Sequence, residues 1–370
     1  MKVHYNYLGQ EFNDTSILFK EWSKLIKSCD FTLGSYVSKL ENMLSSYLGI
    51  KYIISVNTGT DALLLALKSL NIGKNDEVLL PTNTFYATAG AIVATGAKPI
   101  FVDVDDRYQI CIDDLFKKVN KKTKAIIPVH WGGASPDVKL IFKRLKKFNR
   151  KIYIIEDACM GLGGKFKNMR PGTIGDIGAY SFHPLKTVNA IGDGGFIATK
   201  NKKIYDWCKK YRNHGMRSRD LIDFWGMNMR MQPFQCVVVM EGLKKLDKLV
   251  LKRNVNAKIL DDLLSSLNPY VKIPNRPTHE VNTFCLYMIR VKKRDKLIKF
   301  LSKNNIETKI HYPIPLHKQK AAKEILDQSN IFSLPKSETQ AKDLLTLPVH
   351  QYLSKKQIIY MANKIKEFYL

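Results

Sequence analysis

One lysine stands just beyond the predicted end of an apolar strand in the stretch Ser181-Phe182-His183-Pro184-Leu185-Lys186. A glycine-rich turn, Gly192-Asp193-Gly194-Gly195, follows and leads into another apolar run. A lysine in a loop is usually a solvated charge, so Lys186 alone predicts no function. Whether Lys186 has a function depends on which residues the rest of the chain brings to the same end of the sheet.

Short apolar runs alternate with helical patterns around this stretch, between about residue 50 and residue 200. The alternation predicts an α/β domain built around a mostly parallel sheet. Ligands of such sheets bind at the carboxyl ends of the strands. The predicted strands are 52–56, 77–80, 99–102, 125–129, 152–155, 179–182 and 195–199, and the helices between the earlier ones include 60–70 and 87–95.

The C-terminal third of the chain has a different pattern. A helical pattern begins at Gln232 and continues past Lys252, which is long enough to bridge two domains. An apolar strand and two helices follow and predict a small C-terminal α+β domain. These elements are expected at 284–291, 294–303 and 355–368. We place the domain boundary near residue 245, which makes 1–245 the large domain and 246–370 the small one.

Three further features lie at predicted strand ends. An acidic pair follows an apolar strand, and its second member, Asp157, can face the ligand crevice. A carboxylate there can keep a pyridine nitrogen protonated, which makes the ring an electron sink. Gly59 precedes a helix whose free amides suit a phosphate. Phe85 offers an aromatic ring on which a ligand ring can stack.

Each of these features also has an ordinary structural explanation. Asp157 can cap a helix or a turn, the residues around Gly59 look like any helix cap, and Phe85 can be a core aromatic. Together with Lys186, however, they supply a phosphate cradle, an aromatic lid, a pyridinium partner and an amine nucleophile within one domain. This combination predicts pyridoxal 5'-phosphate, held by Lys186 as a Schiff base.

Composition narrows the class of protein. The chain has 370 residues, of which 45% are hydrophobic, and a formal net charge of +27. Its lysines are spread over predicted helix faces and no RNP, zinc-finger or helix-turn-helix pattern occurs, so we expect no nucleic-acid partner. No apolar run suits a membrane span, no signal-peptide pattern opens the chain, and the six scattered cysteines lack metal-ligand spacing. We expect a cytoplasmic protein without a membrane or metal site.

These motifs resemble those of the DegT/DnrJ/EryC1/StrS aminotransferases, the sugar-aminotransferase branch of the fold-type I pyridoxal-phosphate enzymes. The resemblance extends from Phe31-Thr32-Leu33-Gly34 to the C-terminal helix. It implies an aspartate-aminotransferase-like large domain and a homodimer with shared active sites. The motifs that carry it are NTGTDAL at 57–63, PTNTFYAT at 81–88, GAKPIFVD at 96–103, EDA at 156–158, GDIGAYSFHPLK at 175–186, GDGG at 192–195, GMNMRM at 226–231 and HYPIPLH at 311–317.

The resemblance also implies a role for each motif residue. Lys186 forms the Schiff base and moves the proton, Asp157 pairs with the pyridine nitrogen, and Phe85 stacks on one face of the ring. The implied phosphate-binding residues are Gly59, Thr60, Ser181 and, from the other subunit of the dimer, Asn228. Three residues of the later motifs are expected near the substrate mouth, where a structural role is an equal alternative: Arg230, His311 and Tyr312.

Two positions depart from the family's pattern. Family members usually carry a small residue two positions after the aspartate and Gln three positions after it, where this chain has Cys159 and Met160. Cys159 is compact enough to lie against the second face of the cofactor ring. Met160 cannot donate a hydrogen bond to the phenolic oxygen of the cofactor. The substitution puts the tuning of the cofactor in question, but not its presence.

The function that the resemblance implies is the transfer of an amino group, with L-glutamate as the expected donor, to a keto-sugar. Most relatives act on nucleotide-linked sugars, and their products enter surface polysaccharide or lipopolysaccharide. The family's sugar dehydratases carry His in place of the Schiff-base lysine, so Lys186 argues against that alternative. A non-catalytic basic binding or regulatory protein on the same fold is the other alternative. The sequence does not identify the sugar or the carbon that receives the amino group.

Overall fold

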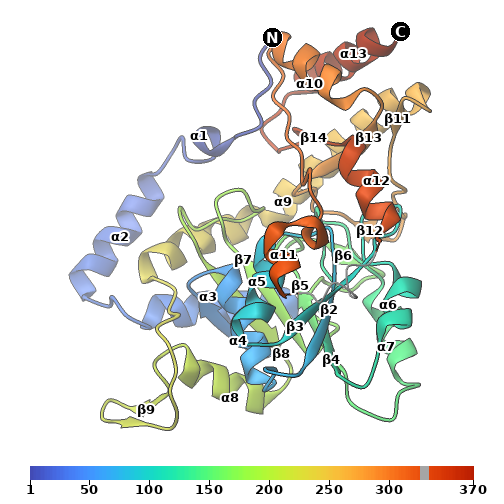
Figure 1. Cartoon of the computed structure of the whole chain (residues 1–370). Coiled ribbons are helices and arrows are strands. Elements are labelled where there is room, and N and C mark those ends of the chain that lie inside the picture. Colours follow the sequence, from blue (N-terminus) through green and yellow to red (C-terminus); the bar gives the residue numbers. More distant parts are fainter. Residues whose placement is uncertain (326–332) are drawn as a thin grey trace.

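The computed structural model describes residues 1–325 and 333–370. Its centre is a seven-stranded sheet with the strand order β1-β8-β7-β5-β4-β2-β3 (Figure 1). Neighbouring strands are parallel except at β8, which is antiparallel to both β1 and β7. The strands are β1 (Tyr52–Val56), β2 (Glu77–Pro81), β3 (Lys98–Val102), β4 (Thr123–Ile126), β5 (Tyr153–Asp157), β7 (Ile177–Ser181) and β8 (Gly195–Thr199).

The predicted α/β class and mostly parallel sheet are confirmed, and each predicted strand of this region overlaps an observed one. The prediction was wrong at the end of β4, which stops at Ile126 and not at Val129. Pro128 follows, and because proline has no backbone N–H it cannot continue the ladder of hydrogen bonds. Val129 regains a single bridge, to Asp157.

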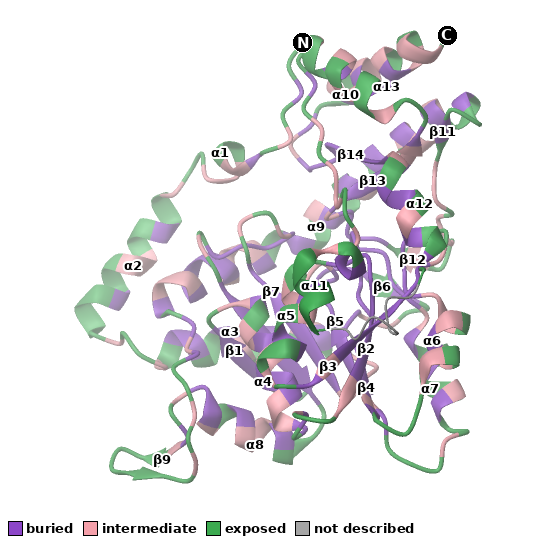
Figure 2. Ribbon diagram, viewed as in Figure 1, coloured by how far each residue is buried: buried purple, intermediate pink, exposed green. Residues whose placement is uncertain are grey.

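Helices cover both faces of the sheet, which is why its strands are continuous apolar runs. Successive residues of β1 show the two faces: Ile54 packs with the cluster that contains α4, and Ile53 with the cluster that contains α3. Both residues are buried. Figure 2 shows that the strands of this sheet are coloured mostly as buried. The helices of this part are α2 (Ser16–Ser28), α3 (Ser35–Leu48), α4 (Gly59–Ser69), α5 (Tyr86–Ala94), α6 (Ile112–Lys118), α7 (Val138–Leu145) and α8 (Lys202–Tyr211).

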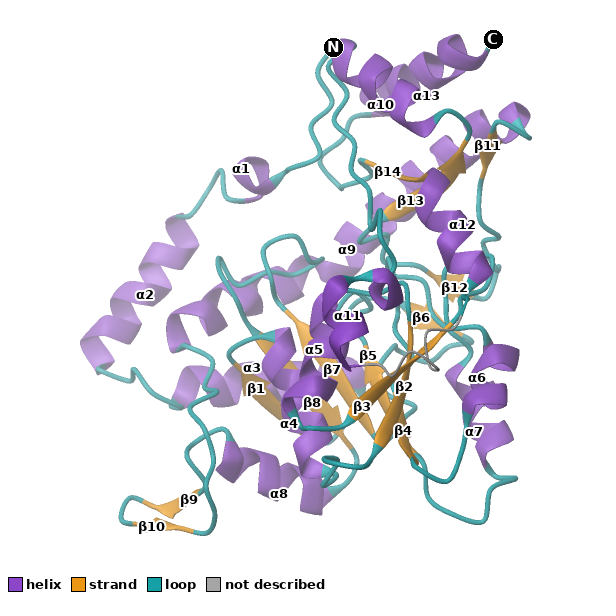
Figure 3. Cartoon of the chain, in the orientation of Figure 1, coloured by secondary structure: helices purple, strands orange, loops and turns teal. Residues whose placement is uncertain are grey.

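A smaller lobe contains an antiparallel sheet with the order β11-β13-β14. The N-terminus belongs to its core, since Val3 is fully buried there and pairs with Ile306. Its elements are β11 (Val271–Lys272), β13 (Tyr287–Val291), β14 (Leu344–Leu347), α10 (Arg294–Lys303), α12 (Pro335–Asp343) and α13 (Lys355–Tyr369). The remaining short elements are α1 (Leu8–Glu11), β6 (Lys165–Phe166), β9 (Met216–Ser218), β10 (Leu221–Ile222), β12 (Glu280–Val281) and α11 (Lys320–Ile325) (Figure 3).

One long helix, α9 (Pro233–Leu264), joins the two lobes. Its N-terminal half contributes Val239 to the core that contains α3, and its C-terminal half contributes Leu260 to the core of the smaller lobe. The domain division at residue 245 lies inside this helix and stays a prediction. In the described part of the chain, we find no helix with the length and apolarity that crossing a membrane requires.

Candidate active site

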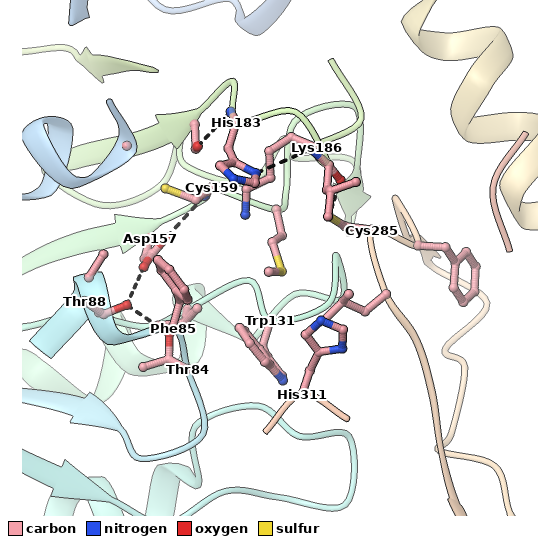
Figure 4. Close-up of a pocket in the computed structure, with 18 of the residues that line it drawn as sticks. Thr84, Phe85, Thr88, Trp131, Asp157, Cys159, His183, Lys186, Cys285 and His311 are labelled. Atoms are coloured by element: carbon pink, nitrogen blue, oxygen red, sulfur yellow. Dashed lines mark hydrogen bonds between the residues drawn. The ribbon is translucent and has the colours of Figure 1, made fainter. Parts of the chain in front are cut away.

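Four strands deliver residues of the predicted motifs to one edge of the main sheet. The carboxyl ends of β1, β2, β5 and β7 lie together there because these strands run in the same direction. A cavity of about 320 Å³ opens at this edge. Its wall includes Gly59 beyond β1 and Ser181 at the end of β7. Phe85 beyond β2 and Asp157 at the end of β5 also line it (Figure 4).

Most of the predicted site residues line this cavity. Asn228 and Arg230 do not line it within a single chain. The side chain of Arg230 instead donates a hydrogen bond of 2.8 Å to Asn213, in the segment that carries the β9–β10 hairpin. The binding roles of all these residues stay predictions. Those that line the cavity are Gly59, Thr60, Phe85, Asp157, Cys159, Ser181, Lys186, His311 and Tyr312, together with Met160.

The carboxylate of Asp157 is 5% exposed and is held at both oxygens. Thr88 Oγ1, on α5, donates to Oδ2 at 2.8 Å, and the backbone N–H of Cys159 donates to Oδ1 at 3.2 Å. Thr84 Oγ1 lies 2.9 Å from Thr88 Oγ1 and extends the network (Figure 4). These contacts fix the direction of the carboxylate, which is what a partner for a pyridine nitrogen requires.

Glu156 has a different environment because successive residues of a strand face opposite sides. Its fully buried carboxylate accepts hydrogen bonds from His130 Nε2 and from the backbone amides of Gly172, Ile174 and Gly175. Burial alone would raise the pKa of Glu156, but these donors outweigh it and lower the pKa. Glu156 therefore fixes the 172–175 turn beneath β5, while Asp157 lines the cavity.

The start of α4 forms a tight cradle next to Ser181. A Cβ atom added to Gly59 would lie 2.7 Å from Ser181 Cβ and 3.1 Å from Cys159 Sγ, so no larger residue fits without a shift. Thr58 Oγ1 caps the helix by accepting from Asp61 N at 2.8 Å. The first amides of the helix, at Gly59 and Thr60, have no carbonyl four residues earlier within it and are available to an anion. The cradle therefore suits a phosphate group.

Lys186 lies in a turn beyond β7, where its N–H donates to the carbonyl of His183 at 2.9 Å. Of the imidazoles that line the cavity, two, those of His183 and His311, lie within reach of the charge of Lys186. Burial and the charge of Lys186 lower the pKa of His183, and the same two causes lower the pKa of His311 to about 4. Both imidazoles are therefore neutral near pH 7, and Lys186 is the amine of this wall.

An aromatic group contributes Phe85, Trp131 and Tyr312 to the cavity wall. Tyr312 is the centre of the group, with ring centroids 5.3 Å from Tyr86, 5.6 Å from Trp131 and 6.3 Å from Phe85. Such a wall is typical of pockets that bind ring-shaped ligands between apolar faces and a few polar groups. On the side of β5, burial and the Asp157 carboxylate raise the pKa of Cys159, so its thiol stays protonated.

Sequence reasoning missed several residues of the cavity wall. Thr88 closes one of the quoted motifs but received no role, and Trp131 lies outside every motif. Tyr7, Arg253 and His350 come from the N-terminal segment, from α9 and from the turn after β14. They come from three segments that are far apart in the sequence. No local pattern distinguishes Arg253 from the neighbouring basic residues of its helix, so only the fold reveals it.

The donor set fits pyridoxal phosphate: a helix N-terminus with a glycine cradle for phosphate, a fixed carboxylate for a ring nitrogen, an aromatic ring and a lysine amine around one cavity. Fold and site together define a pyridoxal-phosphate-dependent aminotransferase of the aspartate-aminotransferase-like fold. The chain belongs to the DegT/DnrJ/EryC1/StrS aminotransferase family, whose sequence model matches residues 14–366.

Known relatives cover almost the whole chain. A "pleiotropic regulatory protein" of Geobacillus stearothermophilus is 35% identical over 94% of this chain and 92% of its own length. The dTDP-3-amino-3,6-dideoxy-α-D-galactopyranose transaminase of Aneurinibacillus thermoaerophilus is 33% identical over 94% and 93%. The crystal structure of NtdA from Bacillus subtilis with bound cofactor PMP superposes with a TM-score of 0.90 at 26% identity, covering 99% of this chain and 85% of that chain. The expected family, fold and cofactor are confirmed.

Proposed function

We propose that this aminotransferase moves an amino group from L-glutamate to a nucleotide-linked keto-sugar whose product enters surface polysaccharide or lipopolysaccharide. The observation that carries the proposal is the cavity itself, whose lining brings Lys186 and Asp157 together with aromatic rings such as Trp131 and Tyr312. The name of the Aneurinibacillus relative, a dTDP-amino-sugar transaminase, supports a nucleotide-linked substrate. A formal net charge of +27 favours the approach of such an anion.

The residues of the chain divide the work of the reaction. Bound pyridoxal phosphate supplies an electron sink that makes a neighbouring C–H bond acidic. The amides of Gly59 and Thr60 hold the phosphate, and the Asp157 carboxylate holds a proton on the ring nitrogen. The Lys186 amine removes a proton from the substrate carbon and returns one, as general base and then general acid. The neutral imidazole of His311 does not compete for that proton.

We propose further that the enzyme is a homodimer with shared active sites. Asn228 and Arg230 lie outside the cavity of their own chain, and this supports a role in the cavity of the other subunit. The same segment exposes apolar side chains: Trp225 is 88% exposed and Leu221 is 57% exposed. Exposed apolar groups of this size on a projecting hairpin are typical of an association surface. The location of the enzyme in the cytoplasm stays a prediction.

Neither alternative function has an observation in its favour. The dehydratase branch has His at the position where this chain has Lys186, and Lys186 lines the cavity. A purely regulatory protein would not need the fixed carboxylate of Asp157 or the tight cradle at Gly59. The regulatory name of the Geobacillus relative describes that protein and does not exclude chemistry in this one.

A spectroscopic experiment tests the function. The purified enzyme with pyridoxal phosphate is expected to absorb visible light, to lose that absorbance on addition of L-glutamate, and to regain it with the accepted keto-sugar. Nucleotide-linked, phosphorylated and free keto-sugars are compared, and mass spectrometry identifies the amino-sugar. Lys186→Ala serves as the control that forms no product. Unchanged absorbance with glutamate and the other common amino acids, and no amino-sugar from any acceptor, would contradict the proposal.

A further inference from the structure

A tyrosine near the N-terminus contacts the main chain of the catalytic lysine. Tyr7 Oη donates a hydrogen bond of 3.1 Å to the carbonyl oxygen of Lys186, across 179 residues of sequence. Tyr7 Oη in turn accepts a hydrogen bond of 2.9 Å from Arg253 Nη2, on α9. The three residues form one chain of hydrogen bonds that runs from α9 through the N-terminal segment to the lysine turn.

Arg253 is a rigid anchor for this chain of bonds. Its side chain is 1% exposed, and its guanidinium is held at two further nitrogens. Nε donates to Gln351 Oε1 at 2.8 Å, and Nη1 donates to the carbonyl oxygen of Phe284 at 3.3 Å. A planar guanidinium fixed at all three nitrogens has a single orientation. Its contact with Tyr7 is therefore fixed as well.

The chemistry of the two donors determines the direction of the bonds. A guanidinium has no acceptor atom, so Tyr7 must accept from Arg253 and has its single O–H left for the carbonyl of Lys186. Burial raises the pKa of Tyr7 to about 12, so the phenol keeps this proton across the working range of pH. Its ring packs against His350 and Tyr352, with centroids 5.1 Å and 6.0 Å away.

The lysine turn has few other anchors in the described part of the chain. Its backbone bond from Lys186 N to His183 O is internal to the turn, and the thiol of Cys285 approaches Leu185 O only at 3.6 Å. One residue beyond Lys186, the buried Thr187 donates a hydrogen bond of 2.9 Å from Oγ1 to the carbonyl oxygen of Leu162. Leu185 is 39% exposed. The part of the turn before Thr187 therefore has little packing, and such a segment opens easily unless a specific contact holds it. Tyr7 supplies that contact on the peptide unit of Lys186 itself.

We propose that Tyr7 and Arg253 are positioning residues for Lys186, an inference that rests on the proposed transamination by this site. They touch neither substrate nor reacting atoms in this role. The side chain of Lys186 is a flexible four-carbon stem that ends in the amine. Because Tyr7 and Arg253 fix the main chain from which this stem starts, the amine returns to the same position in each proton transfer. A misplacement of about 1 Å costs up to about a hundredfold in rate.

The central variant is Tyr7→Phe, which keeps the buried ring and removes only the hydroxyl. Tyr352→Phe is the matched control. It also removes one hydroxyl from a ring in this group, since Tyr352 packs on Tyr7, but Tyr352 does not line the cavity. We expect Tyr7→Phe to lower kcat about tenfold, the effect of one lost hydrogen bond, with the KM values for both substrates unchanged. The kcat of Tyr352→Phe is expected to stay within about twofold of the wild-type kcat.

Two readouts do not depend on turnover. Hydrogen exchange of the peptide that covers residues 183–187 is expected to be about fivefold faster in Tyr7→Phe than in the control, in the holoenzyme and in full-length enzyme stripped of cofactor. The visible absorbance that appears when stripped enzyme takes up pyridoxal phosphate is expected to develop more slowly. Arg253→Lys retains a single donor nitrogen. Its rates of exchange and of cofactor uptake are expected to lie between those of the wild type and those of Arg253→Gln. The Tyr7→Phe/Arg253→Gln double variant should take up cofactor no more slowly than the slower of the two single variants, because both substitutions break the same chain of hydrogen bonds.

The outcomes separate the possible errors. Exchange and cofactor uptake that match the wild type in Tyr7→Phe would overturn the positioning role. A selective rise in the KM for glutamate in Arg253→Lys, with unchanged kcat, would also overturn it and would make Arg253 a carboxylate-binding residue. Because exchange and uptake need no sugar, a failure to find any sugar acceptor would count against the proposed function and leave these two measurements as a test of Tyr7.

Discussion

Thr88 donates a hydrogen bond of 2.8 Å to Asp157 Oδ2 and so ties the first turn of α5 to the end of β5. We expect Thr88→Val, which is nearly isosteric, to lower kcat/KM about tenfold, because Asp157 loses one of its two hydrogen bonds. Steady-state kinetics checks this. Thr95→Val is the matched control, since Thr95 lies at the other end of α5 and bonds only locally. Equal rates for Thr88→Val and the control would show that the bond does not orient Asp157.

Asp157→Asn tests the carboxylate itself. A neutral amide cannot hold a proton on the pyridine nitrogen, so we expect kcat to fall by at least about a hundredfold. Thermal unfolding should show only a modest loss of stability, because an amide oxygen can still accept from Thr88 or from the N–H of Cys159. A variant that keeps most of its rate would make Asp157 a structural residue.

Glu156→Gln should damage stability much more. The carboxylate of Glu156 serves His130 and three backbone amides, and an amide group would place an N–H against one of these donors. We expect a loss of about 3–5 kcal/mol in the free energy of unfolding, the usual effect of breaking a buried charged network. Urea denaturation measures it. Glu77→Gln, at an exposed contact with Asn120, is the control and should change stability by less than about 0.5 kcal/mol.

Glu11 gives the stability of the fold a dependence on pH. Burial raises the pKa of Glu11 to about 7, and the attraction of Arg253 only partly offsets this. Between about pH 4.5 and pH 7 the folded state binds more protons than the unfolded chain, so this group makes folding less favourable as the pH rises. Glu11→Gln should therefore gain about 3 kcal/mol in free energy of unfolding over the wild type as the pH rises from 4.5 to 8, because each unit of the raised pKa corresponds to about 1.4 kcal/mol.

Urea denaturation at several pH values measures this difference for Glu11→Gln. The exposed variant Glu367→Gln is the control, and its curve should run parallel to that of the wild type across the same range. A constant difference between Glu11→Gln and the wild type from pH 4.5 to pH 8 would show that Glu11 ionises normally in the folded protein.

Met160 lines the cavity and its backbone carbonyl accepts from Thr283 Oγ1 at 2.6 Å, which holds the residue in place. We expect Met160→Gln to shift the pH at which the visible absorbance of the bound cofactor changes, because glutamine adds a donor for the phenolic oxygen. Met160→Leu, which adds no donor, should titrate like the wild type. Identical titrations of all three enzymes would show that the side chain at position 160 points away from the ring.

Mixed dimers test the shared site. Lys186→Ala and Asn228→Ala homodimers are both expected to be impaired. If Asn228 serves the site of the other subunit, a mixed dimer contains one site with both lesions and one intact site, because two-fold symmetry makes the sharing reciprocal. Refolding the two variants together should then restore activity. If mixed dimers form and no activity returns, Asn228 acts within its own chain or not at all.

The sequence was sufficient for the fold because its strands are short apolar runs separated by strong helical patterns. It also predicted the wall residues that immediately follow strands, such as Asp157 and Phe85, since the carboxyl ends of parallel strands meet at one edge. It could not predict Tyr7 or Arg253. Their positions depend on how the N-terminal segment and α9 fold back over the lysine turn, and a single pattern of neighbouring residues carries no information about such a contact.

The alternation of Glu156 and Asp157 on β5 has a consequence for the evolution of the gene. The two carboxylates differ by one methylene group, yet one fixes a buried turn and the other lines the cavity. Deleting or inserting a single codon within the strand would exchange the faces of the two residues and disable both at once. We therefore expect point substitutions near β5 to be tolerated more often than a change in the number of its residues. Any descendant that keeps the aminotransferase activity should keep the length of this strand.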